Sequence, residues 1–199
     1  PQTAENVAQQ FNIDRADQDQ FALTSQKRTA TAQAQGFFKH EIIPVSIAQR
    51  KGDPIVIDTD EHPRASTTLE GLAKLKPVVT AEGTVTAGNA SGINDGAAAV
   101  LIASEAAIEQ YQLKPRAKII ASTAVGVEPR IMGFAPAPAI KKLLKQANLS
   151  IEQMDVIELN EAFAAQALAV TRDLGLADDT TQVNPNGGAI AIGHPLGAS

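Results

Sequence analysis

The sequence predicts an α/β fold in which buried strands alternate with helices. Three short apolar segments are typical of strands covered on both faces, at 97–103, 117–127 and 156–159. Helical segments follow them in the chain, at 104–111, 138–147 and 161–174. This alternation favours an α/β sheet whose strands are joined by right-handed helical crossovers.

The first 36 residues are predicted to form two helices. Val7 and Phe11 indicate a short first helix. Asp14 is suited to the N-cap of a second helix, with Asp17 three residues further on as a capping partner. Gly36 is suited to the position just beyond the end of that helix, where a left-handed backbone is common.

Residues 37–83 resemble an inserted subdomain more than part of a large core. Apolar residues at 42–47 and 55–57 predict two strands, and Lys51-Gly52-Asp53-Pro54 between them supplies turn residues. A short amphipathic helix is expected at 67–75, ended by Pro77.

The composition excludes several classes of protein. Hydrophobic residues make up 44% of the 199 residues and charged residues 20%, so a disordered or low-complexity chain is excluded. The net charge of −5 argues against a protein that binds nucleic acid over its whole surface. No segment reaches the ~20 apolar residues that a membrane-spanning helix needs. We therefore expect neither nucleic acid nor a membrane as a partner.

The cysteine count is zero, so these residues hold no disulfide, no cysteine metal ligand and no cysteine nucleophile. This agrees with a cytoplasmic location. Three scattered histidines, at positions 40, 62 and 194, predict no metal site.

Pro1 is not an initiator methionine, and the Gly-rich stretch 193–199 precedes a helix that the sequence does not contain. We therefore expect an internal piece of a longer protein.

Asn160 follows a predicted buried strand, in the segment Leu159-Asn160-Glu161-Ala162-Phe163. Two interpretations are open. Asparagine is a favoured N-cap residue, so Asn160 could simply cap the next helix. Alternatively, the carboxyl end of a strand in an α/β sheet is a common ligand site, and the amide could hold a water or an oxygen there.

His194 lies in the glycine-rich stretch 184–199. The glycine spacing matches neither a dinucleotide-binding G-x-G-x-x-G nor a Walker loop, which disfavours nucleotide or redox chemistry. The glycines let the main chain approach a ligand and present the imidazole from a tight bend. If Pro195 begins a helix, the positive helix end favours a neutral imidazole. The alternative is an ordinary loop histidine.

Three further segments are ambiguous when each is taken alone. Residues 87–96 are small and polar, which suits either a surface loop or a loop that lies against a ligand. Arg64, near Lys74 and Lys76, could face a phosphate or simply be solvated. Met132 and Phe163 could line an apolar pocket or pack in the core.

Together these segments resemble the thiolases, which make or break β-ketoacyl-CoA thioesters. The resemblance covers essentially the whole chain. Its most specific part is the stretch 184–199, and the Asn160-Glu161-Ala162-Phe163 block and loop 87–96 are further hallmarks. Within the family, segments 60–64 and 127–134 look most like the bacterial degradative enzymes that act on β-ketoadipyl-CoA in the breakdown of aromatic compounds.

The resemblance implies a thiolase-like fold, built from two similar α/β halves and an inserted loop domain. By this scheme residues 1–93 are part of the loop domain. Residues 94–113 are the end of the N-terminal half, and residues 114–199 are part of the C-terminal half. For the full-length protein the resemblance implies a homo-oligomer, a tetramer, that uses coenzyme A as a substrate with no other cofactor and no metal.

The resemblance also implies roles for single residues. His194 matches the histidine that activates a nucleophilic cysteine. With a water held by the residue that matches Asn160, it also binds the thioester oxygen. Ser91 and Gly92 match contacts to the pantetheine arm, and Arg64 matches a residue near the nucleotide end of CoA. The last two positions, Met132 and Phe163, match residues that line the substrate pocket.

The chain departs from the family pattern because the two catalytic cysteines of thiolases are missing from it. Without a thiolate to take the acyl group, these 199 residues alone are expected to be inactive. The expected reaction, thiolytic cleavage of β-ketoadipyl-CoA to succinyl-CoA and acetyl-CoA, belongs to the full-length protein. Two alternatives stay open: a general acetoacetyl-CoA thiolase, and a non-catalytic structural piece. Arg130 is a candidate partner for a substrate carboxylate only if it points inward.

Overall fold

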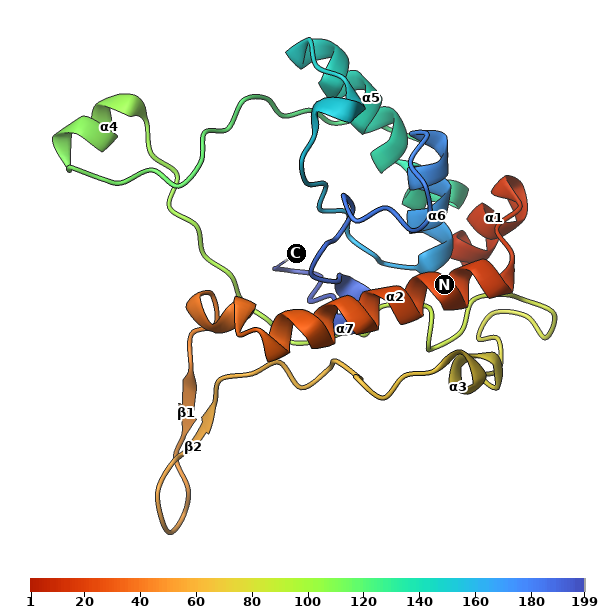
Figure 1. The fold of residues 1–199 in the computed structure, drawn as a ribbon, viewed down its shortest axis with the longest axis horizontal. Coiled ribbons are helices and arrows are strands. Elements are labelled where there is room, and N and C mark those ends of the chain that lie inside the picture. Colours follow the sequence, from red (N-terminus) through yellow and green to blue (C-terminus); the bar gives the residue numbers. More distant parts are fainter. Residues whose placement is uncertain (199) are drawn as a thin grey trace.

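The structure is a computed structural model that describes residues 1–198. It consists mainly of helices joined by extended segments (Figure 1). The α-helices are α1 (Gln2–Phe11), α2 (Arg15–Ala34), α3 (Leu69–Ala73), α4 (Glu105–Gln110), α5 (Pro136–Ala147), α6 (Ala164–Asp173) and α7 (Ala189–Ile192). The 3₁₀ helices are η1 (Phe37–His40), η2 (Pro129–Phe134) and η3 (Ile151–Gln153), and the strands are β1 (Val45–Ile47) and β2 (Ile55–Ile57).

The long helix α2 begins and ends as its sequence predicts. The side chain of Asp14 accepts a hydrogen bond from the backbone N–H of Asp17, at 2.8 Å, which confirms the N-cap. Gly36 follows the C-cap with a φ of +70°, so the left-handed position beyond the helix is also confirmed. Figure 1 shows α2 running beneath α6 and beside α7.

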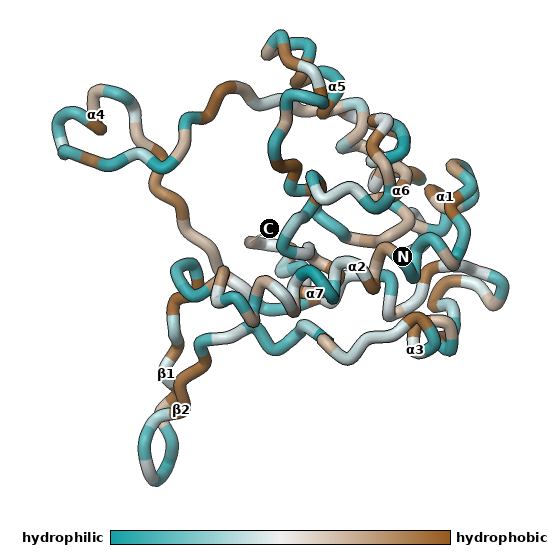
Figure 2. Tube along the Cα trace, viewed as in Figure 1, coloured by the Kyte–Doolittle hydropathy of each residue, from teal (hydrophilic) through white to brown (hydrophobic). Residues whose placement is uncertain are grey.

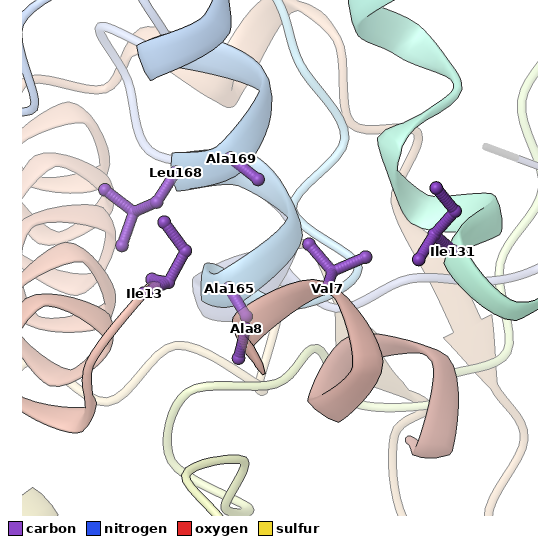
Figure 3. Packing of buried hydrophobic residues seen from close by; sticks show 7 residues of the cluster. All are labelled: Val7, Ala8, Ile13, Ile131, Ala165, Leu168 and Ala169. Atoms are coloured by element: carbon purple, nitrogen blue, oxygen red, sulfur yellow. The ribbon is translucent and has the colours of Figure 1, made fainter. Parts of the chain in front are cut away.

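The main apolar cluster joins α1, α6 and η2 (Figure 3). Val7 of α1 and Leu168 of α6 are both buried, and Phe11 stacks on Phe134 with ring centroids 4.3 Å apart. A second cluster packs α2 against α3, α6 and α7 through Leu23, Leu72 and other buried residues. These two clusters fix α6, which follows Asn160 in the chain, and α7, which precedes His194.

The predicted hairpin is present but projects away from the rest of the chain. Strands β1 and β2 pair antiparallel, with Val45 opposite Ile57. Figure 1 shows the hairpin extending from the end of η1, and Figure 2 shows that it carries hydrophobic residues. Val45 and Val56 are exposed, so the hairpin presents an apolar surface.

The other predicted strands are wrong as local assignments. Residues 97–103 and 117–127 are extended but belong to no strand, and Val100 and Ile119 are 85% and 70% exposed. Segment 156–159 contributes a single parallel bridge, from Ile157 to Val183. A strand is stabilised by the hydrogen bonds of its neighbours, and within residues 1–198 the structure pairs only β1 with β2 as a sheet.

Candidate active site

Asn160 and His194 meet although 34 positions separate them in the chain. The amide Nδ2 of Asn160 lies 3.3 Å from the ring Nε2 of His194. Whether this ring nitrogen donates or accepts a hydrogen bond depends on the tautomer of the imidazole. The backbone N–H of His194 donates to the carbonyl of Gly92, at 2.9 Å. Three separate segments, near residues 92, 160 and 194, therefore converge at one point.

The interpretation of Asn160 as a helix cap is wrong. Helix α6 begins at Ala164 with Phe163 as its N-cap residue, so Asn160 lies three positions too early to cap it. The preceding residue, Leu159, is clamped by Asn184: its N–H donates to Asn184 Oδ1 and its carbonyl accepts from Asn184 Nδ2, both at 2.8 Å. The exposed amide of Asn160 is thus presented from a fixed backbone.

The surroundings of His194 differ from the expectation of a positive helix end. His194 follows Gly193, the C-cap residue of α7, so it lies beyond the negative end of that helix. The last carbonyls there already have partners: that of Ile190 accepts from Gln26 Nε2, and that of Ala191 lies 2.8 Å from His62 Nδ1. Pro195 begins a turn, closed by the Ala198 N–H donating to its carbonyl at 2.8 Å. Within residues up to 198 this turn does not become a helix, and Ser199 lies outside the described residues.

The loop 87–96 packs directly against the Asn160 and His194 segments. Both the N–H and the hydroxyl of Ser91 donate to the carbonyl of Ala162, at 3.0 and 3.1 Å. At Gly193, with a φ of +92°, an added side chain would overlap the amide of Asn94. The small residues of this loop therefore permit a close approach of neighbouring main chains.

His62 also belongs to this group of residues, although the sequence analysis gave it no role. Its ring Nδ1 lies 2.8 Å from the carbonyl oxygen of Ala191 in α7. Its Nε2 faces Gly92 so closely that a methyl group on Gly92 would collide with it. The motif Glu61-His62-Pro63-Arg64 carried the signal, but nothing in the sequence showed that it would reach α7.

A cavity of about 400 Å³ opens beside these segments. Arg64, His62 and Gly92 line it together with Gln26, Leu72 and Leu75. The backbone N–H of Arg64 donates to the Gln26 side chain at 2.8 Å, which ties the Arg64 loop to α2. The volume is within the usual range for small-molecule sites, and an arginine at its wall suits an anionic group.

Five of the seven expected site residues, Asn160 and His194 among them, do not line this cavity. Ser91 and Phe163 are half-buried, and Met132 in η2 is 61% exposed. Phe163 instead pairs through its backbone with Ala90. Arg130 does not point inward: its guanidinium donates to the Gln10 side chain at 3.0 Å on the exposed surface. Arg130 therefore does not meet the condition, an inward direction, for a partner of the substrate carboxylate.

A buried polar cluster lies directly behind Asn160. Glu161 is 1% exposed and accepts hydrogen bonds from the Ser25 hydroxyl and the Asn184 amide, at 2.7 and 2.8 Å. Burial raises the pKa of Glu161, while these hydrogen bonds oppose that shift. Ser25 could not be identified from the sequence, because the polar residues of α2 give no sign of facing inward.

Two features are absent from residues 1–198. In that part of the chain no three His, Cys, Asp or Glu side chains are grouped as metal ligands would be. Nor does that range contain a helix that is long and apolar enough to cross a membrane.

The chain belongs to the thiolase family. Residues 2–106 match the thiolase N-terminal domain and residues 113–199 match the thiolase C-terminal domain. Its fold is the thiolase fold, as the sequence predicted: it superimposes on the acetyl-CoA acetyltransferase of Bacillus anthracis with a TM-score of 0.94 at 46% identity. That match covers 99% of this chain and 49% of the other.

Among its relatives, a β-ketoadipyl-CoA thiolase of Acinetobacter baylyi is 82% identical over all 199 residues, which are 50% of that protein. A β-ketoadipyl-CoA thiolase of Pseudomonas aeruginosa is 61% identical over the same residues, 49% of its length. Human mitochondrial 3-ketoacyl-CoA thiolase in complex with CoA has a TM-score of 0.93 at 49% identity, covering all of this chain and 48% of that chain. The chain thus spans about half the length of the relatives it matches.

Proposed function

We propose that the full-length protein containing these residues cleaves β-ketoadipyl-CoA with CoA, giving succinyl-CoA and acetyl-CoA. The observation that carries the proposal is the Asn160–His194 contact, 3.3 Å, in a chain 82% identical to a β-ketoadipyl-CoA thiolase. The two side chains supply polar groups at one point, where negative charge on a thioester oxygen can be stabilised.

In this proposal the imidazole of His194 first accepts the proton of a cysteine thiol. That cysteine must lie outside the 199 residues, because they contain none. The resulting thiolate adds to the β-keto carbon, and the Cα–Cβ bond breaks to leave a succinyl thioester on the cysteine and the enolate of acetyl-CoA. That enolate takes a proton from an acid outside these residues, and the thiolate of CoA then attacks the succinyl thioester, which releases succinyl-CoA and the cysteine thiolate. The ring N–H and a water held by the Asn160 amide donate to the thioester oxygen as negative charge develops on it.

We place CoA along the cavity that Arg64 and Gly92 line, with Arg64 facing the phosphates and Ser91 and Gly92 beside the pantetheine arm. Met132 and Phe163 are proposed to face the acyl chain. No cofactor or metal beyond the CoA substrate is proposed.

The proposed division of the chain has three parts. The loop domain is residues 1–93, the end of the N-terminal half is residues 94–113, and part of the C-terminal half is residues 114–199.

Replacement of Arg64 by alanine in the full-length protein is expected to raise the KM for CoA substrates several-fold with little change in kcat. Contacts to phosphate act alike in the ground state and the transition state, so their loss weakens binding without slowing the chemical step. Steady-state kinetics measure this. Arg50→Ala, an exposed arginine beside the hairpin turn, is the matched control. An unchanged KM in Arg64→Ala would contradict the proposed orientation of CoA.

The substrate itself is tested by comparing full-length kcat/KM for β-ketoadipyl-CoA and acetoacetyl-CoA. We expect the dicarboxylic substrate to be preferred. The alternative, a general acetoacetyl-CoA thiolase, gains support from the surface position of Arg130 and from the 54% identity to an acetyl-CoA acetyltransferase of Allochromatium vinosum, over 99% of this chain and 50% of that protein. Preference for the short substrate would favour that alternative.

The 199 residues alone are proposed to be a non-catalytic piece, because they lack cysteine and leave segments 97–103 and 117–127 without partner strands. Turnover by the isolated chain would contradict this.

We propose that the full-length protein is cytoplasmic and homotetrameric, with no nucleic-acid or membrane partner. A monomer in solution scattering would contradict the assembly.

A further inference from the structure

Glu161 is a buried charged residue that the proposed chemistry does not use. Its side chain is almost fully enclosed, and so are those of Ser25 and Asn184, each 2% exposed. A buried carboxylate is costly unless donors surround it, so its presence directly beside Asn160 calls for a physical reason. We refer to these three residues as the Glu161 cluster.

The Glu161 carboxylate accepts hydrogen bonds from three donors. Oε2 accepts from the Ser25 hydroxyl at 2.7 Å and from the backbone N–H of Ile190 at 3.2 Å. Oε1 accepts from Asn184 Nδ2 at 2.8 Å. The Ser25 oxygen in turn accepts from the N–H of Gly188, at 3.1 Å. Both carboxylate oxygens are thus used as acceptors, which suits the ionised form.

These hydrogen bonds join the two segments that carry Asn160 and His194. On one side, Asn184 binds both backbone polar groups of Leu159, the residue before Asn160. On the other side, Ile190 lies in α7, four positions before His194. Ser25 attaches the cluster to the long helix α2, a rigid element.

We propose that Glu161 is a positioning residue that holds Asn160 and His194 at their working separation, through Ser25, Asn184 and the N–H of Ile190. This inference rests on the proposed function, because the separation matters to turnover only if the pair carries out the chemistry. A residue that only stabilised the fold would change the amount of folded enzyme and leave the turnover of each folded molecule unchanged.

The substitution Glu161→Gln tests the proposal with almost no change in size. The amide NH₂ must replace one of the two oxygens. In one orientation it faces Asn184 Nδ2, and in the other it faces the Ile190 N–H, so either orientation sets a donor against a donor. The segment that carries Asn160 or the segment that carries His194 must then shift.

In the full-length protein we expect Glu161→Gln to lower kcat at least about tenfold and to leave the KM for CoA within about twofold, because small displacements of reacting groups have large effects on rate. Glu109→Gln, at an exposed position in α4, is the matched control and should change neither constant. Ser25→Ala, which removes one of the three donors, should lower kcat in the same direction by a smaller factor.

Circular dichroism and a CoA titration establish how much of each variant is folded. A normal kcat per folded molecule in Glu161→Gln would overturn the proposal. If that variant does not fold, Ser25→Ala decides, and an unchanged kcat there would overturn it. His194→Ala separates the two hypotheses: a large loss of kcat in His194→Ala with none in Glu161→Gln refutes only the positioning role, and no loss in His194→Ala refutes the proposed function.

Discussion

His194→Ala in the full-length protein is expected to lower kcat by about 10³-fold or more while CoA binding stays close to normal. The imidazole is proposed to act twice, as the base for the thiol and as a donor to the thioester oxygen, and each role alone is worth about 10²-fold or more. The imidazole of His194 does not line the cavity, and the backbone of Arg64 is held by Gln26 of α2, so the variant should leave the cavity wall that carries Arg64 unchanged.

Steady-state kinetics and a CoA titration measure the two quantities on the same preparation. His40→Ala is the control, because His40 is exposed in η1 and lies outside the group of residues around the cavity. Near-normal turnover in His194→Ala would remove the imidazole from the mechanism. Equal losses in both variants would point to a general effect on the fold.

Features set by neighbouring residues could be predicted from the sequence. The cap at Asp14, the left-handed Gly36 and the hairpin turn at 51–54 depend on a few adjacent positions, and each is present as expected. The glycine-rich stretch also indicated the bend that presents His194, since small residues leave room for close main chains.

Features that depend on distant partners could not be predicted in this way. Segment 97–103 has the composition of a buried strand, yet Val100 is exposed because no described segment lies alongside to pair with it. Ser25 reads as an ordinary polar helix residue, and its carboxylate partner is 136 positions away. The direction of the Arg130 side chain, on which its candidacy as a carboxylate partner depended, could not be predicted for the same reason, because its partner Gln10 lies on α1.

Gly187→Ala in the full-length protein is expected to lower the free energy of unfolding by about 3 kcal/mol or more. Gly187 has a φ of +82°, a left-handed conformation that costs other residues about 1–2 kcal/mol. An added methyl group would also overlap the Thr29 hydroxyl and come within 2.6 Å of the Ser25 carbonyl oxygen. Both atoms belong to helix α2, so relief requires a backbone shift and costs about 1–3 kcal/mol more.

Gly175→Ala separates the two contributions. Gly175 has nearly the same backbone conformation, with a φ of +76°, but no atom lies within 4 Å of the methyl group it would gain. This control should therefore lose only the conformational part, about 1–2 kcal/mol. Urea unfolding measures both variants. Equal losses would show that the segment before α7 is not pressed against α2, and would also weaken the case that Glu161 and Ser25 hold that segment in place.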